Sequence, residues 1–344
     1  MRIKVLFLWA ILCLIASPGL LAQRGSAQGE GMVEVKLASP MPRDSAWGKT
    51  LDRMAVEWAR VTNNEVRLRV LHNGQEGTEG KMLSSLSSNN IQAGIFTSFG
   101  LSKICPGVMT LSVPFIIRND AELDLALKET KPLLEAEAAK TDFFVLAWSK
   151  VGWVNFFSKD PVFTPDDLRK QKIASSPETR EMNTAFITMR FQVEEAELTN
   201  AGPKLASGAI GSVYMAPAAI AAYQLDTYLK NMMDPPIAAA MGGIVINKIT
   251  WNKINRLNPA YQRELIRVTQ RIASEFDASM PKTSADAVAQ MSRRGLKINK
   301  LSPAQEEVWR AEMRRVIPSL LGKTFDQEIY QRISAALTRY RGGQ

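Results

Sequence analysis

Few side chains in this sequence could carry out covalent chemistry. The chain has a single histidine, His72, in a strand-like segment that runs into a turn. Nucleophilic machinery built on histidine, or a histidine-rich zinc site, would depend on that one residue. The acidic pairs Asp166-Asp167 and Glu194-Glu195 are adjacent in sequence, which is not the spacing of a general acid and a general base. We therefore expect no catalytic residues, no metal site and no cofactor, and we interpret His72 as a strand-end or loop residue.

A glycine-rich turn over residues 74–80 is the segment that most resembles a phosphate-binding loop. Its sequence is Gly-Gln-Glu-Gly-Thr-Glu-Gly. It contains neither the Lys-Ser/Thr pair of a P-loop nor the glycine spacing of a dinucleotide-binding turn. We interpret it as a loop between two regular elements.

The net charge of the chain is basic but evenly distributed. The sequence has 43 lysines and arginines against 34 acidic residues, a formal charge of +9. Basic pairs such as Arg293-Arg294 and Arg314-Arg315 lie in segments that also carry acidic residues. Nucleic-acid-binding domains concentrate positive charge on one face or stripe, so we expect no nucleic-acid partner.

The N-terminus has the pattern of a secretory signal peptide. A basic start with Arg2 and Lys4 precedes an apolar run over residues 5–15, and Ser17-Pro18-Gly19 breaks any helix before small residues. The run is shorter than the roughly 20 residues that a permanent membrane helix needs, so we favour export over anchoring. We predict that residues 1–22 are removed and that the protein is periplasmic. Only Cys105 remains after that cut, so no internal disulfide is expected.

Strand-like and helix-like segments alternate after Met32. Residues 33–38 and 65–71 alternate with period two, and residues 45–60 between them have apolar side chains at helical spacing. Such a β-α-β order predicts an α/β fold with a parallel type of sheet. The aromatic segment 146–157 is predicted to cross from a first lobe into a second, and residues 258–291 are predicted to form a long amphipathic helix.

The region from Phe163 to Trp251 carries a resemblance to a known family. The order and spacing of its elements resembles the DctP-type solute-binding subunit of tripartite ATP-independent periplasmic (TRAP) transporters. The positions that match the family pattern are Leu168, Lys172, Ile173, Gly208, Pro217, Gln224, Trp251 and Lys253. The resemblance implies a two-lobe periplasmic-binding-protein-like fold with a central ligand cleft and long connecting helices.

The sequence departs from the family where the family binds charge. Its signature arginine grips a substrate carboxylate as a bidentate fork, but Ala174 occupies that position here. Val154 occupies the position of a second family arginine, and Gly211 replaces the usual aspartate. Without either arginine, a carboxylate would lose a charge-assisted pair, so we expect a rather apolar organic ligand. Arg180 or Arg190 could take over anion binding, which would reverse this inference.

Candidate ligand-binding residues lie at the strand ends and loops that the resemblance places in the cleft. Aromatic side chains on a strand such as Trp153 are also commonly core residues, and this alternative stays open for Tyr214 and Met215. The predicted ligand-binding residues are Pro42, Phe99, Trp148, Trp153, Asn155, Ala174, Ser175, Tyr214 and Met215.

The predicted domain organisation has two discontinuous lobes. Residues 32–148 plus 237–275 form the first lobe, and residues 149–236 plus 276–344 form the second lobe with the C-terminal helices. The function that follows is a solute-binding receptor that delivers a small-molecule ligand to TRAP membrane permease subunits. The resemblance also allows a tetratricopeptide-repeat periplasmic partner. The alternatives are an exported enzyme or scaffold that kept the fold, and a sensor-linked ligand receptor.

Overall fold

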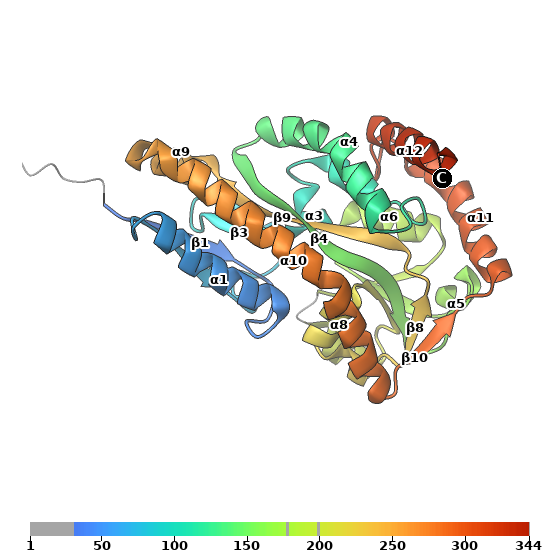
Figure 1. Ribbon diagram of the computed structural model, residues 1–344. Coiled ribbons are helices and arrows are strands. Elements are labelled where there is room, and N and C mark those ends of the chain that lie inside the picture. The colour runs from blue at the N-terminus through green and yellow to red at the C-terminus, as the bar shows by residue number, and fades with distance from the viewer. Residues whose placement is uncertain (1–30, 177–178, 198–199, 344) are drawn as a thin grey trace, which may run out of the picture. The chain divides into compact units, whose positions relative to one another are not determined.

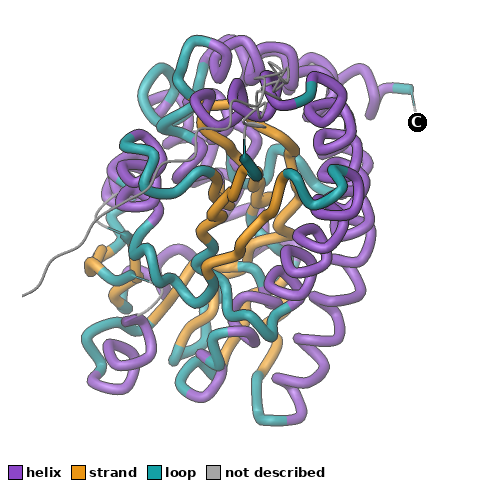
Figure 2. Tube along the Cα trace, turned by 90° about the vertical axis from the view of Figure 1, so that its left-hand side faces the viewer, coloured by secondary structure: helices purple, strands orange, loops and turns teal. Residues whose placement is uncertain are grey.

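The computed structural model describes residues 31–176, 179–197 and 200–343. Residues 32–344 form one compact unit, in which strands lie inside and helices lie around them (Figures 1 and 2). The predicted signal peptide, residues 1–22, lies outside the described residues. The strands are β1 (Val33–Ala38), β2 (Val66–Leu71), β3 (Ala93–Thr97), β4 (Phe143–Ser158), β5 (Lys172–Ser175), β6 (Gln192–Glu195), β7 (Ser212–Met215), β8 (Asn231–Asp234), β9 (Ala238–Asn247) and β10 (Lys297–Lys300).

The helices alternate with these strands along most of the chain. They are α1 (Ala46–Val61), α2 (Glu79–Ser87), α3 (Ser98–Leu101), α4 (Asp120–Ala139), α5 (Pro165–Arg169), α6 (Arg180–Thr188), α7 (Ala201–Ser207), α8 (Pro217–Ala222), α9 (Lys248–Leu257), α10 (Pro259–Arg293), α11 (Pro303–Leu320) and α12 (Gln327–Gly342), with 3-10 helices η1 (Pro106–Ser112) and η3 (Leu225–Thr227).

Helix starts follow the capping signals in the sequence. The hydroxyl of Ser45 accepts a hydrogen bond from the Gly48 amide at the start of α1, and Ser302 forms a capping box with Gln305 at the start of α11. Such caps satisfy amides that have no partner within the helix. The long helix predicted for residues 258–291 is confirmed as α10, which begins after the Asn258 cap.

The strands form a mixed sheet in two sections that share β4. The order β2-β1-β3-β9-β4 makes the first section, and β4-β7-β5-β6 continues into the second, where β8 also pairs with β4 and with β10. The expectation of a parallel sheet holds for β1, β2 and β3 and for β5, β6 and β7. It is wrong for β9, which runs antiparallel to β3 and β4, and for β4, which runs antiparallel to β7 and β8.

Strand β4 changes partner partway along its length. Residues up to Val154 pair with β9 in the first section, and residues from Asn155 pair with β7 and β8 in the second. Helix α10 packs along β4 and runs beside it through both sections (Figure 1). Leu265 and Ile272 of α10 belong to a core cluster of the first section, whereas Met291 belongs to one of the second. Two continuous elements therefore link the sections.

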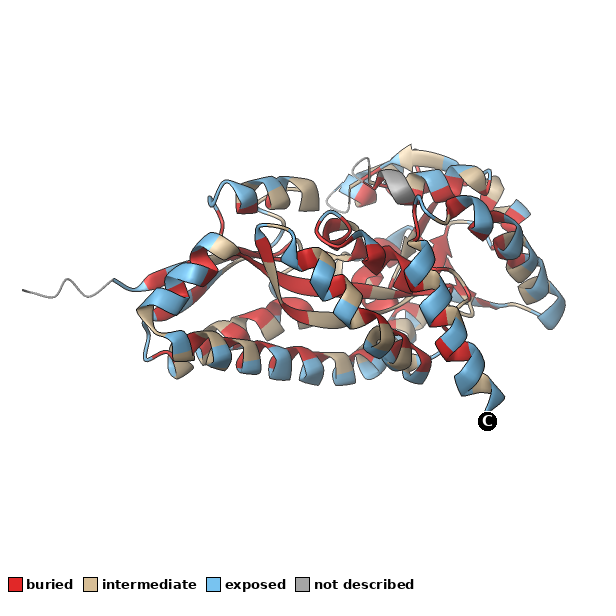
Figure 3. Cartoon of the chain, turned by 90° about the horizontal axis from the view of Figure 1, so that it is seen from above, coloured by how far each residue is buried: buried red, intermediate tan, exposed pale blue. Residues whose placement is uncertain are grey.

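Buried residues gather on the strands and on the helix faces that turn toward them (Figure 3). Helices α1, α9 and α10 cover one face of the first section, and η1, α4 and α12 pack with its other face. Helix α11 packs in the second section, where Trp309 and Met313 join the buried cluster around Phe156. The C-terminal helix α12 thus returns to the first section after α11.

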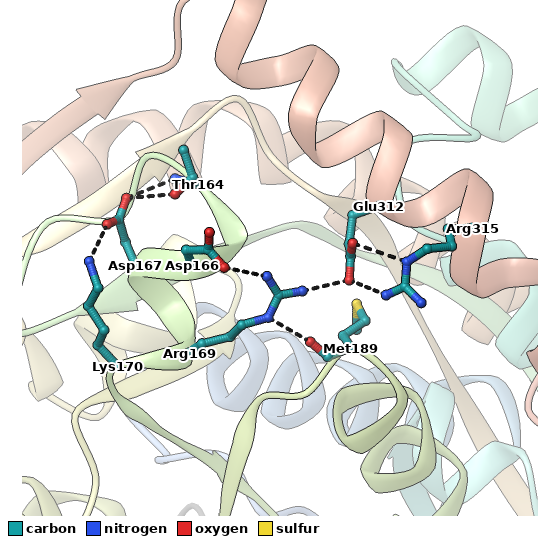
Figure 4. Close-up of polar contacts among 8 residues, drawn as sticks. All are labelled: Thr164, Asp166, Asp167, Arg169, Lys170, Met189, Glu312 and Arg315. Atoms are coloured by element: carbon teal, nitrogen blue, oxygen red, sulfur yellow. Dashed lines mark hydrogen bonds and ion pairs between the residues drawn. The ribbon is translucent and has the colours of Figure 1, made fainter.

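A charged network attaches α11 to the second section (Figure 4). Arg169 at the end of α5 donates to Asp166 and Glu312, each at 2.6 Å, and to the Met189 carbonyl at 3.1 Å. Glu312 also accepts from Arg315 at 2.6 Å. Because Arg169 is committed to these partners, it contributes to the packing of α11 and is not free to bind a ligand.

Candidate functional site

A cavity of about 70 Å³ opens at the carboxyl ends of β1 and β3. In α/β proteins ligands commonly bind at such strand ends, where loops provide the side chains. Its walls come from the loop after β1, from α1 and α10, and from the adjoining parts of β3, β4 and β9. The lining residues are Pro40, Met41, Trp47, Thr50, Leu51, Met54, Glu79, Ile95, Phe96, Thr97, Ser149, Val151, Gly242, Gly243, Ile244, Ala273 and Phe276. We call this space the cleft cavity.

The loop after β1 is held in place by hydrogen bonds to the loop after β2. The amide of Asn73 donates to the Met41 carbonyl at 3.0 Å, and the amide of Gly74 donates to the Ser39 carbonyl at 3.1 Å. A Cβ atom on Gly48 would lie 2.2 Å from the Arg43 carbonyl oxygen, so only glycine allows α1 to begin this close to the loop. The backbone at this edge of the cavity is therefore fixed before any ligand binds.

Glu79 is the charged residue of the cavity wall. Its carboxylate accepts hydrogen bonds from the Thr97 amide at 3.0 Å, from the Thr97 hydroxyl at 3.1 Å and from the Gly100 amide at 2.7 Å. These contacts join the start of α2 to the start of α3. Glu79 therefore orders the two helix starts and also brings a negative charge to the cavity.

A second carboxylate, that of Asp277 on α10, lies behind the β4 wall. It accepts from the Ser149 hydroxyl at 2.5 Å and from the Lys150 amide at 3.0 Å. The pairing of β4 with β9 is irregular just beyond, between Lys150 and Gly152. Burial raises the pKa of Asp277 to about 6, although these hydrogen bonds oppose the shift. Asp277 thus fixes β4 next to Ser149 and Val151, both of which line the cavity.

Helix α8 of the second section packs beside the cavity. Its residues Ala218 and Ala219 belong to one buried cluster with Met41, Trp47 and Phe276 of the cavity wall. Tyr223, which follows α8, donates from its hydroxyl to the Pro40 carbonyl at 2.7 Å. The cavity therefore lies next to a contact between the two sections, although α8 itself does not line it.

The second section contains a smaller apolar cavity of about 20 Å³. It is lined by core side chains that include Phe156, Phe186, Tyr214 and Trp309. The ring centroid of Tyr214 lies 5.3 Å from that of Phe156 and 6.0 Å from that of Phe186. Burial raises the pKa of the Tyr214 hydroxyl. A space of this size holds about one water molecule in this arrangement of the side chains.

The family model for bacterial extracellular solute-binding proteins, family 7 (DctP), matches residues 37–323. The chain belongs to this family. It confirms the resemblance on which the two-lobe fold was predicted, and the family is one of solute-binding proteins and not of enzymes. Among residues 31–176, 179–197 and 200–343, no helix has the length and apolar character needed to cross a membrane.

Curated relatives of this DctP-family chain match it over part of their length. A solute-binding protein of Chromohalobacter salexigens is 28% identical over 128 residues, which are 37% of this chain and 38% of that protein. One from a Sulfitobacter species is 22% identical over 193 residues, 55% of this chain and 58% of that protein. The matched regions thus span less than two thirds of either relative.

Solved structures share the fold over nearly their whole length. A TRAP periplasmic solute-binding protein of Sulfurospirillum deleyianum with bound succinate has a TM-score of 0.81 at 18% identity, covering 89% of this chain and 99% of that one. One of Pseudomonas putida with bound D-glucuronate has a TM-score of 0.79 at 17% identity, covering 88% and 97%. At such identities the likeness establishes the two-lobe fold.

The structure places the predicted site residues close to the cleft cavity in some cases and in core packing in others. Pro42 follows Pro40 and Met41, which line the cavity, and Phe99 follows Thr97, which also lines it. Met215 packs against the cluster of Met41 and Trp47. Phe99 itself packs against the second-section cluster, and Tyr214 lines the smaller cavity. The site assignment for these residues stays a prediction.

The other predicted residues make structural contacts around β4 and β5. Trp148 and Trp153 pack against a first-section core cluster, and the indole of Trp153 donates to Asp120 at 2.9 Å. Asn155 donates to the Met233 carbonyl at 2.9 Å. Ala174 packs against a second-section cluster, and the Ser175 hydroxyl lies 3.2 Å from that of Thr179. Like the four above, these five are not among the residues that line the cleft cavity.

None of the residues that line the cavity was among the predicted ligand-binding residues. Those missed include Trp47, Glu79, Val151 and Phe276. Trp47 and Phe276 fit the apolar periodicity of their helices and could be recognised only as core candidates. Glu79 lies in the glycine-rich turn that we interpreted as a loop. The signal available in the sequence was that Glu79 precedes the apolar Met82 by three residues, which places Glu79 in the first turn of a helix.

No basic residue lines the cleft cavity among the residues that the structure describes. Arg190 is exposed and follows α6, and the side chain of Arg180 lies outside the described residues. Nor do the described residues contain a cluster of His, Cys, Asp and Glu that could hold a metal ion. His72 directly follows β2, as expected for a strand-end residue, and its Nε2 lies 2.8 Å from Asp52.

Proposed function

We propose that this protein is a periplasmic receptor that captures a small organic solute between its lobes and delivers it to a TRAP-type permease. The cleft cavity carries this proposal, because the loop after β1 that lines it also accepts a hydrogen bond from Tyr223, which follows α8 of the second section. A ligand that contacts both sides favours the closed form by its differential binding energy. The family membership supports the same function.

The proposed lobes are residues 32–148 plus 237–275 and residues 149–236 plus 276–344. The division of α10 between two core clusters supports the bound in that helix. Strand β4 changes partners between Val154 and Asn155, later in the chain than the proposed bound after residue 148. Helix α12 belongs to the second range in sequence but packs on α4 of the first lobe. Closure would thus bend β4 and α10 near the cavity, with α12 moving with the first lobe.

The ligand is proposed to be rather apolar and not a small carboxylate. Aromatic and aliphatic side chains make most of the wall, and Trp47 and Phe276 lie with ring centroids 5.7 Å apart. No basic residue lines the cavity among the described residues, so none of the lining side chains would pair with a ligand carboxylate. Relatives with bound succinate or D-glucuronate therefore differ from this receptor in the ligand class proposed here.

Native mass spectrometry of protein purified from its own cell envelope tests this function. We expect a co-purified neutral or amphiphilic organic molecule that denaturation releases. Recovery of a dicarboxylate would overturn the proposed ligand class, and protein without any small molecule would contradict capture. Calorimetric titration with succinate and with its uncharged analogue succinamide provides a direct comparison, in which succinate should bind more weakly.

A variant that narrows the cavity provides the structural control. In Gly242→Ala the new Cβ would lie 2.8 Å from Cγ2 of Val151 and 3.1 Å from the Phe96 carbonyl oxygen, at the cavity wall. We expect this variant to co-purify with less ligand. Gly202→Ala on α7 meets only an ordinary contact, 3.9 Å from Tyr228, and should retain the ligand. Equal occupancy in both variants would place the ligand elsewhere.

Delivery to a permease and a tetratricopeptide-repeat periplasmic partner remain proposals based on the family. Affinity purification of the receptor from crosslinked envelopes, followed by identification of the attached proteins, tests both partners. Recovery of a sensor kinase without a permease would favour the sensor-linked alternative. No observation on the cavity favours an enzyme or a scaffold.

A further inference from the structure

One of the direct contacts between the two sections lies beside the cleft cavity. Helix α8 lies between β7 and β8 in the chain, and both of these strands pair with the second half of β4. The loop of Pro40 and Met41 follows β1 in the first section. Contact between α8 and this loop therefore joins the two lobes and does not stabilise either lobe alone.

The contact has an apolar part built from small and large side chains. Ala218 and Ala219 on α8 are each 5% exposed. They belong to one cluster with Met41 and Trp47 of the first section and with Phe276 and Met280 of α10, the helix on which α8 packs. Burial of this surface favours the closed arrangement by the hydrophobic effect, whether or not a ligand is present.

The contact also has one polar anchor, the hydroxyl of Tyr223. It donates to the Pro40 carbonyl at 2.7 Å, and its oxygen lies 3.9 Å from the sulfur of Met41. Burial raises the pKa of the Tyr223 hydroxyl, and the nearby charge of Glu79 raises it further. The hydroxyl therefore remains protonated and able to donate at any physiological pH.

The Pro40 carbonyl, which accepts this bond, lies in a loop that is held in place by other hydrogen bonds. The Met41 amide donates to the Ser39 hydroxyl at 3.2 Å, and the Asn73 amide donates to the Met41 carbonyl at 3.0 Å. Because the loop is ordered by these bonds, forming the Tyr223 bond costs little additional conformational entropy. Both Pro40 and Met41 line the cavity, so the same loop contacts the ligand space and the second lobe.

We propose that Tyr223 is a positioning residue that latches α8 onto the Pro40 carbonyl and keeps a closed form populated before ligand binds. This inference rests on the two-lobe receptor proposed above. With the latch in place, the ligand does not have to supply all the energy of closure. Closure of the receptor would then depend less on an ion pair between the ligand and a lobe, such as the pair that the family arginine would form at the position of Ala174.

The test compares Tyr223→Phe with Tyr228→Phe by single-molecule energy transfer between dyes on the two lobes. Val56→Cys on α1 and Ile187→Cys on α6 provide exposed attachment sites, at 68% and 63%. The native Cys105 is buried and its pKa is raised to about 12, so it does not compete for the dyes. The protein is first refolded free of small molecules, so the measurement does not need a known ligand.

We expect two populations without ligand, and we expect Tyr223→Phe to lower the closed-to-open ratio about three- to ten-fold, as for the loss of one hydrogen bond. Tyr228, 38% exposed, lies outside the contact and its variant should match the original protein. A merely structural role would lower the melting temperature and leave the ratio unchanged, which would overturn the proposal. A protein that is fully open without ligand would overturn it too.

The two proposals can fail separately. If ligand capture fails in mass spectrometry while the closed population depends on Tyr223, the latch stands and the receptor function is wrong. If a ligand is recovered but the ratio does not respond to Tyr223→Phe, the receptor stands and the latch is wrong.

Discussion

At the scale of single residues, Glu79 shows how one carboxylate can serve two purposes. It accepts hydrogen bonds from the Thr97 amide and hydroxyl and from the Gly100 amide, which join the starts of α2 and α3, and it also lines the cleft cavity. Replacement by glutamine keeps the size of the side chain but turns one acceptor oxygen into an NH₂ group. That group would face the Gly100 amide or the donors of Thr97, which leaves a donor unpaired.

We expect Glu79→Gln to lower the free energy of unfolding by about 1–2 kcal/mol, measured by urea denaturation. Glu76→Gln, in the same glycine-rich turn, is the matched control for loss of charge and should change stability by less than about 0.5 kcal/mol. Similar losses in both variants would mean that net charge, and not the cap on α3, accounts for the effect.

At the scale of elements, the contact of α10 with β4 carries a pH dependence. The pKa of Asp277 is raised by burial to about 6 from an ordinary value of 3.8. The unfolded chain therefore loses this proton at lower pH than the folded chain. The stability linked to Asp277 is fully present below about pH 4 and is lost as the pH rises from about 4 through 6.

Asp277→Asn should remove this pH dependence, because the amide is neutral throughout and its oxygen can still accept from Ser149 and Lys150. At pH 7.5 we expect the variant to be more stable than the original by about 1 kcal/mol, after discounting for partial solvent screening. At pH 4 the two should be nearly equal. Urea unfolding at a series of pH values measures the difference, and a variant that is less stable at pH 7.5 would contradict the assignment.

At the scale of the whole molecule, two continuous elements pass through both lobes. Strand β4 pairs with β9 in one section and with β7 and β8 in the other, and α10 contributes to core clusters of both. Helix α12 adds a third link because it returns from α11 to α4. Neither lobe can unfold without disrupting an element that the other lobe needs.

We therefore expect residues 32–344 to unfold in a single cooperative transition. In scanning calorimetry the calorimetric enthalpy should equal the van't Hoff enthalpy. Two resolved transitions, or fluorescence and circular dichroism curves that do not coincide, would show that the lobes unfold independently despite β4 and α10.

The sequence by itself determined where secondary-structure elements such as β1, α1 and β2 lie, which family the chain belongs to, and which carboxylate-binding arginines it lacks. Period-two and helical patterns are local, so β1, α1 and β2 were predicted within a residue or two of their ends. The absence of arginine at Ala174 and Val154 was likewise visible without a structure. Side chains whose roles depend on neighbours close in sequence leave a signal that can be read directly.

Only the tertiary structure decided which residues meet. The cleft cavity combines Trp47, Glu79, Val151, Gly242 and Phe276, which are far apart in the chain and come together through the sheet order. The antiparallel course of β4 and β9 and the contact of Tyr223 with Pro40 are equally long-range. Apolar periodicity says that Trp47 or Phe276 faces inward, but it cannot distinguish a packed core from the wall of a cavity, because both require the same side chains.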